Sequence, residues 1–261
     1  MSTSSVYPSP TGTAFEVAGR LGYDGVEVMI GIDAVSKDLD ALERLVDSTG
    51  VPVLSIHAPT LLVTQGAWGR DPWEKLRRSG QAAHRLGADV VVVHPPFRWQ
   101  RSYAASFVSG LRELSEEMGI VYAVENMFPW RGPRDTVELR AYSPGWDPTD
   151  IDYDNLTLDL SHASTSRQSS LELVHAWGER LAHVHLTDGS GSLKDEHLFP
   201  GAGDQQAAAV MLELGRLGYP GHVVVEVNTR SMQDPDDRDY ALATTLTFAR
   251  QYLRSPAEAM Q

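Results

Sequence analysis

The chain repeats one pattern of hydrophobic and polar positions along most of its length. Stretches with apolar residues three and four positions apart alternate with short β-branched runs that end in polar residues. The first kind of stretch is typical of a helix with one buried face, and the second of a buried strand. This alternation predicts parallel strands covered by helices. The predicted strands are residues 5–7, 25–29, 51–57, 89–94, 120–125, 156–160, 181–186 and 222–227.

The helical stretches separate these strands, and several end at a glycine, the residue that most readily ends a helix. They cover residues 13–21, 39–46, 73–86, 102–118, 171–180, 206–217 and 240–253. Residues 129–154 lack apolar periodicity and are rich in Pro, Gly, Asp and Trp, so we expect a loop with at most a short helix there. Eight strands in 261 residues fit one (β/α)8 TIM barrel domain over residues 1–261, since such barrels take about 250 residues. An open doubly wound sheet is disfavoured, because no glycine-rich phosphate turn follows an early strand.

Residues that can bind a metal follow six consecutive predicted strands. The carboxyl ends of the strands of a barrel meet at one mouth, so these side chains are predicted to be neighbours in space. Two more donors form an Asp-x-His sequence in the loop after the seventh strand, just before a Pro-Gly-x-Gly turn. The candidate donors are His57, His94, Glu125, Asp159, His162, His185, Asp195, His197 and Glu226.

No single member of this set identifies a metal site. A lone histidine after a strand is more often a hydrogen-bonded polar residue than a ligand. Glu125, Asp159 and Glu226, however, follow apolar runs that should be buried, and a buried carboxylate without a partner is costly. Glu27, at the end of the second strand, is interpreted as a partner of the ligands. His183 is predicted to lie deeper than His185 on the same side of its strand, as a structural residue.

Composition narrows the chemistry further. The chain has no cysteine, so its metal ligands must be nitrogen and oxygen atoms, a set that suits Mn, Zn, Co or Mg better than a calcium cage. A formal net charge of −13 argues against nonspecific nucleic-acid binding. No apolar run approaches the roughly 20 residues of a membrane span, and the first residues lack the features of a secretory signal, so we expect a cytoplasmic protein. A homo-oligomer is compatible with the sequence.

Three further residues are candidates for binding a substrate. Trp99 and Trp130 fall in the loops after the fourth and fifth strands, where stacking on a sugar and anchoring of the loop are equally good interpretations. Arg98, beside Trp99, could bind a phosphate or a carboxylate of the substrate.

These motifs resemble the xylose isomerase-like barrel superfamily, which includes sugar-phosphate isomerases and epimerases as well as apurinic endonucleases of the endonuclease IV type. The resemblance extends from GYDGVE at residues 22–27 to GHVVVE at 221–226, and includes VEN at 124–126, LDLSH at 158–162 and HVHLTD at 183–188. It implies one shared metal site at Glu125, Asp159, His185 and Glu226. The endonuclease branch implies up to two further ions, held by His57, His94, His162, Asp195 and His197.

The resemblance implies two reactions. In an isomerase or epimerase, Glu125 and Glu226, expected on neighbouring strands, would move a proton through an enediolate while His162 orients a hydroxyl. In a phosphodiesterase, the same residues would hold two or three zinc ions, with Glu125 as a bridge. Such an enzyme should grip DNA with basic and aromatic residues, yet residues 58–66 contain neither. A third alternative is a barrel that binds a sugar without turnover.

We therefore predict a divalent-metal-dependent isomerase or epimerase. Its substrate would be a small sugar, a sugar phosphate, an inositol or a related hydroxy-carbonyl compound. The paired Glu125 and Glu226 favour this reaction over sugar binding alone, because binding needs no proton-transfer pair.

Overall fold

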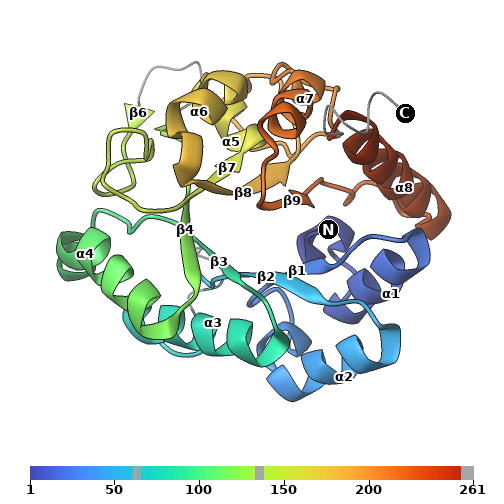
Figure 1. The fold of residues 1–261 in the computed structure, drawn as a ribbon, viewed down its shortest axis with the longest axis horizontal. Coiled ribbons are helices and arrows are strands. Elements are labelled where there is room, and N and C mark those ends of the chain that lie inside the picture. Colours follow the sequence, from blue (N-terminus) through green and yellow to red (C-terminus); the bar gives the residue numbers. More distant parts are fainter. Residues whose placement is uncertain (61–63, 65, 133–137, 254–261) are drawn as a thin grey trace.

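The computed structural model describes residues 1–60, 64, 66–132 and 138–253. Seven parallel strands form one sheet in the order β1-β2-β3-β4-β7-β8-β9, which curves into a nearly closed barrel surrounded by helices (Figure 1). The predicted barrel is confirmed. The strands of the barrel are β1 (Val26–Met29), β2 (Val53–His57), β3 (Val90–Val93), β4 (Val121–Glu125), β7 (Leu156–Asp159), β8 (Leu181–Leu186) and β9 (His222–Val225).

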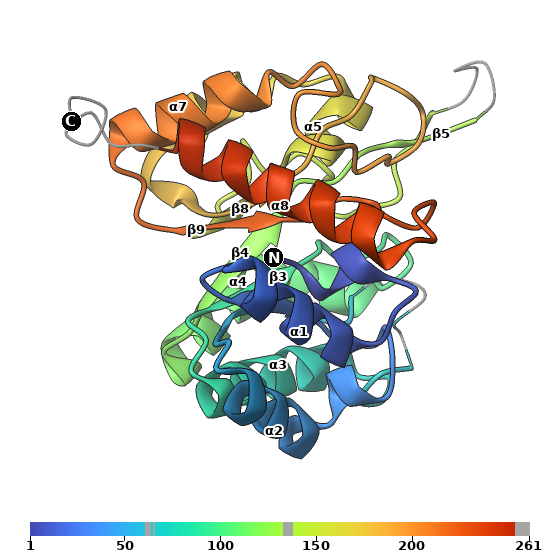
Figure 2. The same ribbon diagram turned by 90° about the vertical axis from the view of Figure 1, so that its right-hand side faces the viewer.

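Helices cover the outside of the barrel all the way round, as the two views in Figures 1 and 2 show. Four of them begin at an aspartate whose side chain accepts a backbone N–H, at Asp38, Asp71, Asp159 and Asp234, which satisfies donors that the first turn leaves unpaired. The helices are α1 (Thr11–Leu21), α2 (Leu39–Thr49), α3 (Pro72–Leu86), α4 (Arg101–Met118), α5 (Leu160–Ser166), α6 (Ser170–Trp177), α7 (Ala207–Leu217) and α8 (Pro235–Tyr252), with short 3-10 turns at η1 (Thr3–Val6), η2 (Val35–Lys37) and η5 (Gly178–Arg180).

The prediction of a first strand at residues 5–7 is wrong, because this segment belongs to the 3-10 turn η1 and to the residue after it. The place between β1 and β9 is taken instead by Met1 and Ser2. The N–H of Ser2 donates to the carbonyl of Val225 (2.8 Å), and the N–H of Glu27 donates to the carbonyl of Met1 (3.0 Å). The side chain of Ser2 then accepts the N–H of Ser4 and starts the turn, as serines near helix starts commonly do.

Two other segments differ from their predicted structure. Leu160 does not end a strand: it is the first residue of α5, which starts at once because the carboxylate of Asp159 accepts the N–H of His162 (2.8 Å). The predicted loop at 129–154 contains a small antiparallel pair, β5 (Trp130–Arg131) with β6 (Glu138–Leu139). Residues 133–137 of that loop lie outside the described part of the chain.

Alternate side chains along the strands lie in two different environments. Along β3, Val91 and Val93 belong to the large hydrophobic core that includes residues of the helices, whereas Val90 and Val92 form a small cluster with Ala123 of β4. The mouth of the barrel, at the carboxyl ends of its strands, is lined by buried polar groups instead. No helix in the described part of the chain is long and apolar enough to cross a membrane.

Candidate metal centre

The four residues of the predicted shared site meet at one atom, the Nδ1 nitrogen of His185 on β8. Glu226, one residue beyond β9, places Oε2 3.0 Å from this nitrogen, and Glu125, at the end of β4, places Oε1 3.1 Å from it. Asp159, at the end of β7, contributes Oδ2 at 3.4 Å. All four side chains are at most 6% exposed, so the polar cluster lies under the surface of the mouth.

Two more histidines approach Glu125 from the other side. His94, directly after β3, places Nε2 2.7 Å from Oε2 of Glu125, and His57, at the end of β2, places Nε2 3.4 Å from the same oxygen. Donor atoms of these three side chains lie within 4.8 Å of one another. Glu125 therefore contacts His57 and His94 with one oxygen and His185 with the other, so it belongs to two potential ion sites.

The remaining donors form a third group near α5. His162 lies in the first turn of this helix, and not at the end of a strand as predicted. Its Nε2 is 3.2 Å from Oδ2 of Asp195, and Nε2 of His197 is 2.8 Å from the same oxygen. Donor atoms of Asp159, His162 and His197 also lie within 4.8 Å of one another. The structure thus brings all nine predicted donors to one mouth, in three overlapping groups.

The loop that holds Asp195 and His197 is fixed by Asp188. Its carboxylate is fully buried and accepts the backbone N–H groups of Gly189, Gly201 and Gln205. These bonds join the start of the loop to the Pro-Gly-x-Gly turn. Hydrogen bonds from backbone N–H groups to the carboxylate of Asp188 therefore hold the loop in place.

The hydroxyl that holds Glu226 was not anticipated from the sequence. Ser4 donates to Oε1 of Glu226 at 2.8 Å, which leaves Oε2 directed to His185. The only signal in the sequence is the run of small polar residues at 2–5, which is equally typical of an irregular terminus. Closure of the barrel by Met1 and Ser2 is what brings Ser4 to this carboxylate.

Opposite charges hold the cluster together in the metal-free protein. Burial would raise the pKa of Glu226, but the charge of His185 outweighs this and lowers the pKa to about 2. Burial would likewise lower the pKa of His162, whereas the charges of Asp159, Asp195 and Glu125 raise it to about 10. The same kind of balance raises the pKa of His185. The charges of protonated His162 and His185 thus balance the carboxylates, as bound metal ions could.

This arrangement predicts that metal binding weakens as the pH falls. His162 has a pKa of about 10, so it is protonated at pH 7 and must lose its proton to become a ligand. Each displaced proton changes the affinity about tenfold per pH unit below that pKa. Calorimetric titrations of the metal-free protein with Zn²⁺ between pH 6 and pH 8 should show this trend, with proton release visible in buffers of different ionisation enthalpy. His162→Gln should make the Zn²⁺ affinity depend less steeply on pH. An affinity of the wild type that does not change with pH would contradict the prediction.

Two of the residues proposed from the sequence to bind a substrate pack against Phe97, and the third is exposed. The ring of Trp99 is stacked on Phe97, with centroids 4.5 Å apart, and the centroid of Trp130 is 6.1 Å from that of Phe97. Arg98 is exposed and lines shallow hollows with Arg140 at the rim. A cavity of about 460 Å³ instead opens beside His94; its lining includes Thr60, Arg70, Lys75, Gln100 and Tyr103.

Comparison with known proteins places the chain in a family. Residues 15–252 match the family model described as the xylose isomerase-like TIM barrel, so the chain belongs to this family. Among individual relatives, an uncharacterized protein of Mycobacterium leprae is 46% identical over 97% of this chain and 96% of its own length. Fructoselysine 3-epimerase of Escherichia coli O157:H7 is 23% identical, over 87% of this chain and 88% of the epimerase. The solved structure of a D-tagatose 3-epimerase-like protein matches with a TM-score of 0.68 and 26% identity, covering 96% of this chain and 97% of that one.

Proposed function

We propose that this protein is a divalent-metal-dependent epimerase or isomerase of a small sugar or a related hydroxy-carbonyl compound. The observation that supports this most is the convergence of Glu125, Asp159 and Glu226 on Nδ1 of His185 within 3.4 Å. Three carboxylates and an imidazole form a donor set suited to Mn, Zn, Co or Mg. The relatives named fructoselysine 3-epimerase and D-tagatose 3-epimerase-like protein support the choice of reaction.

The buried groups fit a cation. Oε2 of Glu125 and Oδ2 of Asp159 are buried and make no well-aligned hydrogen bond within the described part of the chain. A carboxylate oxygen left in this way costs free energy unless a charge compensates it. Cations bound by these two residues would remove that cost. When bound, a divalent ion supplies Lewis acidity to a substrate carbonyl and the neighbouring hydroxyl.

Glu125 and Glu226 are then the pair that moves the proton. They approach His185 from β4 and from beyond β9, so they are not on neighbouring strands as predicted, because β7 and β8 separate them in the sheet. They reach the same site across the barrel and can face a substrate from two sides. One carboxylate removes the C–H proton next to the carbonyl, and the other returns a proton on the opposite face. His162, in contact with Asp195, orients a hydroxyl.

The test is exchange of a substrate proton with solvent. The protein, loaded separately with Mn²⁺, Co²⁺, Mg²⁺ or Zn²⁺, is incubated in D2O with D-fructose, D-tagatose, D-psicose and fructoselysine. Proton NMR should then show loss of the C3 proton signal of at least one ketose and growth of its epimer. Chelator-treated protein provides the control. Binding of a sugar without any exchange would favour the third alternative, a barrel that only binds, and would refute the epimerase.

A specific observation keeps the phosphodiesterase as a second candidate. One ion needs about four ligands, whereas nine donor residues line this mouth. Two or three zinc ions so placed could activate a hydroxide and neutralise a leaving oxygen. Metal analysis separates the two: about one ion per chain favours the epimerase, and about three zinc ions with cleavage of abasic duplex DNA favour the hydrolase. The loop after His57 includes residues 61–63 and 65, which lie outside the described part of the chain.

A further inference from the structure

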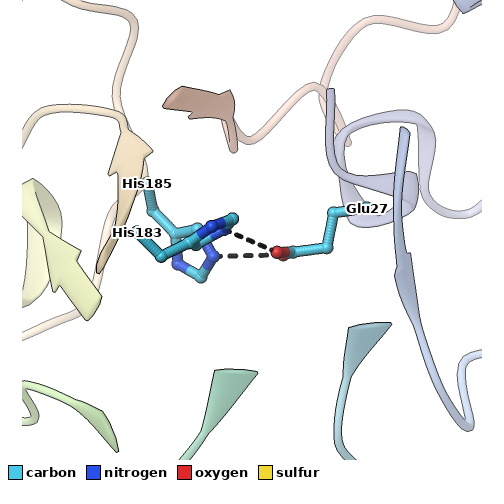
Figure 3. A group of neighbouring side chains, drawn as sticks. All are labelled: Glu27, His183 and His185. Carbon is cyan, nitrogen blue, oxygen red and sulfur yellow. Dashed lines mark hydrogen bonds and ion pairs between the residues drawn. The ribbon is translucent and has the colours of Figure 1, made fainter. Parts of the chain in front are cut away.

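A second polar cluster lies directly behind the candidate metal centre. Figure 3 shows Glu27, from β1, reaching across the barrel toward His183 and His185 of β8. One oxygen of Glu27, Oε2, is 2.8 Å from Nε2 of His183 and 2.7 Å from the hydroxyl of Ser55. The other oxygen, Oε1, is 3.0 Å from Nε2 of His185. All of these side chains are fully buried.

His185 is therefore contacted at both of its ring nitrogens. Nδ1 faces the carboxylates of the candidate metal centre, and Nε2 faces Glu27. Neither Nε2 of His185 nor Oε1 of Glu27 has a well-aligned hydrogen bond with any other described residue. These two atoms lie 3.0 Å apart. Two unpaired buried atoms at this separation satisfy one another at the lowest cost.

We propose that Glu27 is a positioning residue for the metal centre. It accepts the N–H at Nε2 of His185 and so keeps the lone pair at Nδ1 directed toward Glu125, Asp159 and Glu226. Histidines that bind metals generally donate their other N–H to a carboxylate in this way, which fixes the tautomer and the ring orientation. Ser55 and His183 hold the other oxygen of Glu27, so the carboxylate cannot turn away. The inference rests on the proposed metal centre but not on the epimerase reaction.

The same three residues could also be considered as an ion site of their own, since their donor atoms lie close together. The composition of the group argues against this. Among the described residues it contains three donor residues, whereas a closed structural ion site usually provides four protein ligands. Glu27 also already accepts the hydroxyl of Ser55 at 2.7 Å. A role as hydrogen-bond acceptor accounts for all three contacts of this carboxylate.

The experiment compares Glu27→Gln with the wild type in two measurements that do not require turnover. The first is the affinity of the metal-free protein for Zn²⁺, which should fall by about 10- to 100-fold in the variant. The second is the NMR resonance of the proton on Nε2 of His185 in Zn²⁺-loaded protein. This resonance should lie far downfield in the wild type and move upfield in the variant. An affinity within twofold of the wild type together with an unmoved resonance would overturn the proposal.

Two further variants make the result specific. Leu76→Ala removes a fully buried core side chain of α3, a helix on the outside of the barrel. It should lower stability while leaving the resonance unmoved, which separates positioning from a general structural effect. Ser55→Ala keeps the carboxylate but removes one of its donors, and should lower Zn²⁺ affinity a few-fold even if Glu27→Gln fails to fold. If Glu27→Gln binds one Zn²⁺ ion fewer than the wild type and binds the remaining ions with unchanged affinity, Glu27 is a ligand of a separate ion site and the proposal is overturned. A reduced affinity without any sugar exchange would refute only the reaction.

Discussion

Replacement of Glu226 by Gln is expected to lower turnover by roughly 10²- to 10⁴-fold, the range that a positioned acid or base contributes to proton transfer. Gln has the same shape but cannot accept a proton. The fold should be preserved, because Ser4 and His185 can still contact the Gln side chain. Both epimer formation and C3 proton exchange should be lost together, and both are read from the same NMR experiment in D2O.

The variant must be assayed with saturating metal, since Glu226 is also a candidate ligand. Glu213→Gln is the matched control, because Glu213 pairs with Arg216 and His175 on the surface of α7. It should retain activity within about twofold. Undiminished turnover in Glu226→Gln would show that this carboxylate neither gives nor takes the proton.

Removal of His185 is expected to cost the metal-free protein about 3–5 kcal/mol of unfolding free energy, the usual effect of breaking a buried ion pair. This histidine lies within 3.4 Å of four carboxylates, those of Glu27, Glu125, Asp159 and Glu226. In His185→Ala these groups would face one another around a void. Urea denaturation at pH 7 in the presence of a chelator measures the loss.

The loss of unfolding free energy in His185→Ala should be smaller at pH 5 than at pH 7. At the lower pH the crowded carboxylates of the variant take up protons, which replace the charge of the lost histidine. His222→Ala provides a comparison, since His222 is partly exposed and pairs with Asp89. It should cost less than about 1 kcal/mol, as surface ion pairs do. A similarly small loss in His185→Ala would mean that the carboxylates are already neutral in the folded protein.

The strand ends could be predicted from the sequence because their signal is local. Buried parallel strands appear as short β-branched runs, and the polar residue that follows each run must lie at the mouth of the barrel. This reasoning located His57, His94, Glu125 and Glu226 without any knowledge of their neighbours. It failed at His162, because a helix cap at Asp159 ends β7 earlier than the apolar pattern suggests.

Contacts across the barrel could not be predicted in the same way. The pairing of Glu27 with His183 joins residues 156 positions apart, and the contact of Ser4 with Glu226 joins residues 222 positions apart. Both depend on how the sheet closes. The error about Glu125 and Glu226 has the same origin: order along the chain does not tell which side chains meet across the interior.

Glu125 is shared between the group with His57 and His94 and the group with Asp159 and His185. Two cations at this mouth would therefore not load independently, because each would alter the orientation and charge of a ligand needed by the other. Thermodynamic linkage requires that the first ion change the affinity for the second by the same factor in either order of addition. The occupancy of the site in a cell would then follow the ratio of available metals as well as the concentration of each.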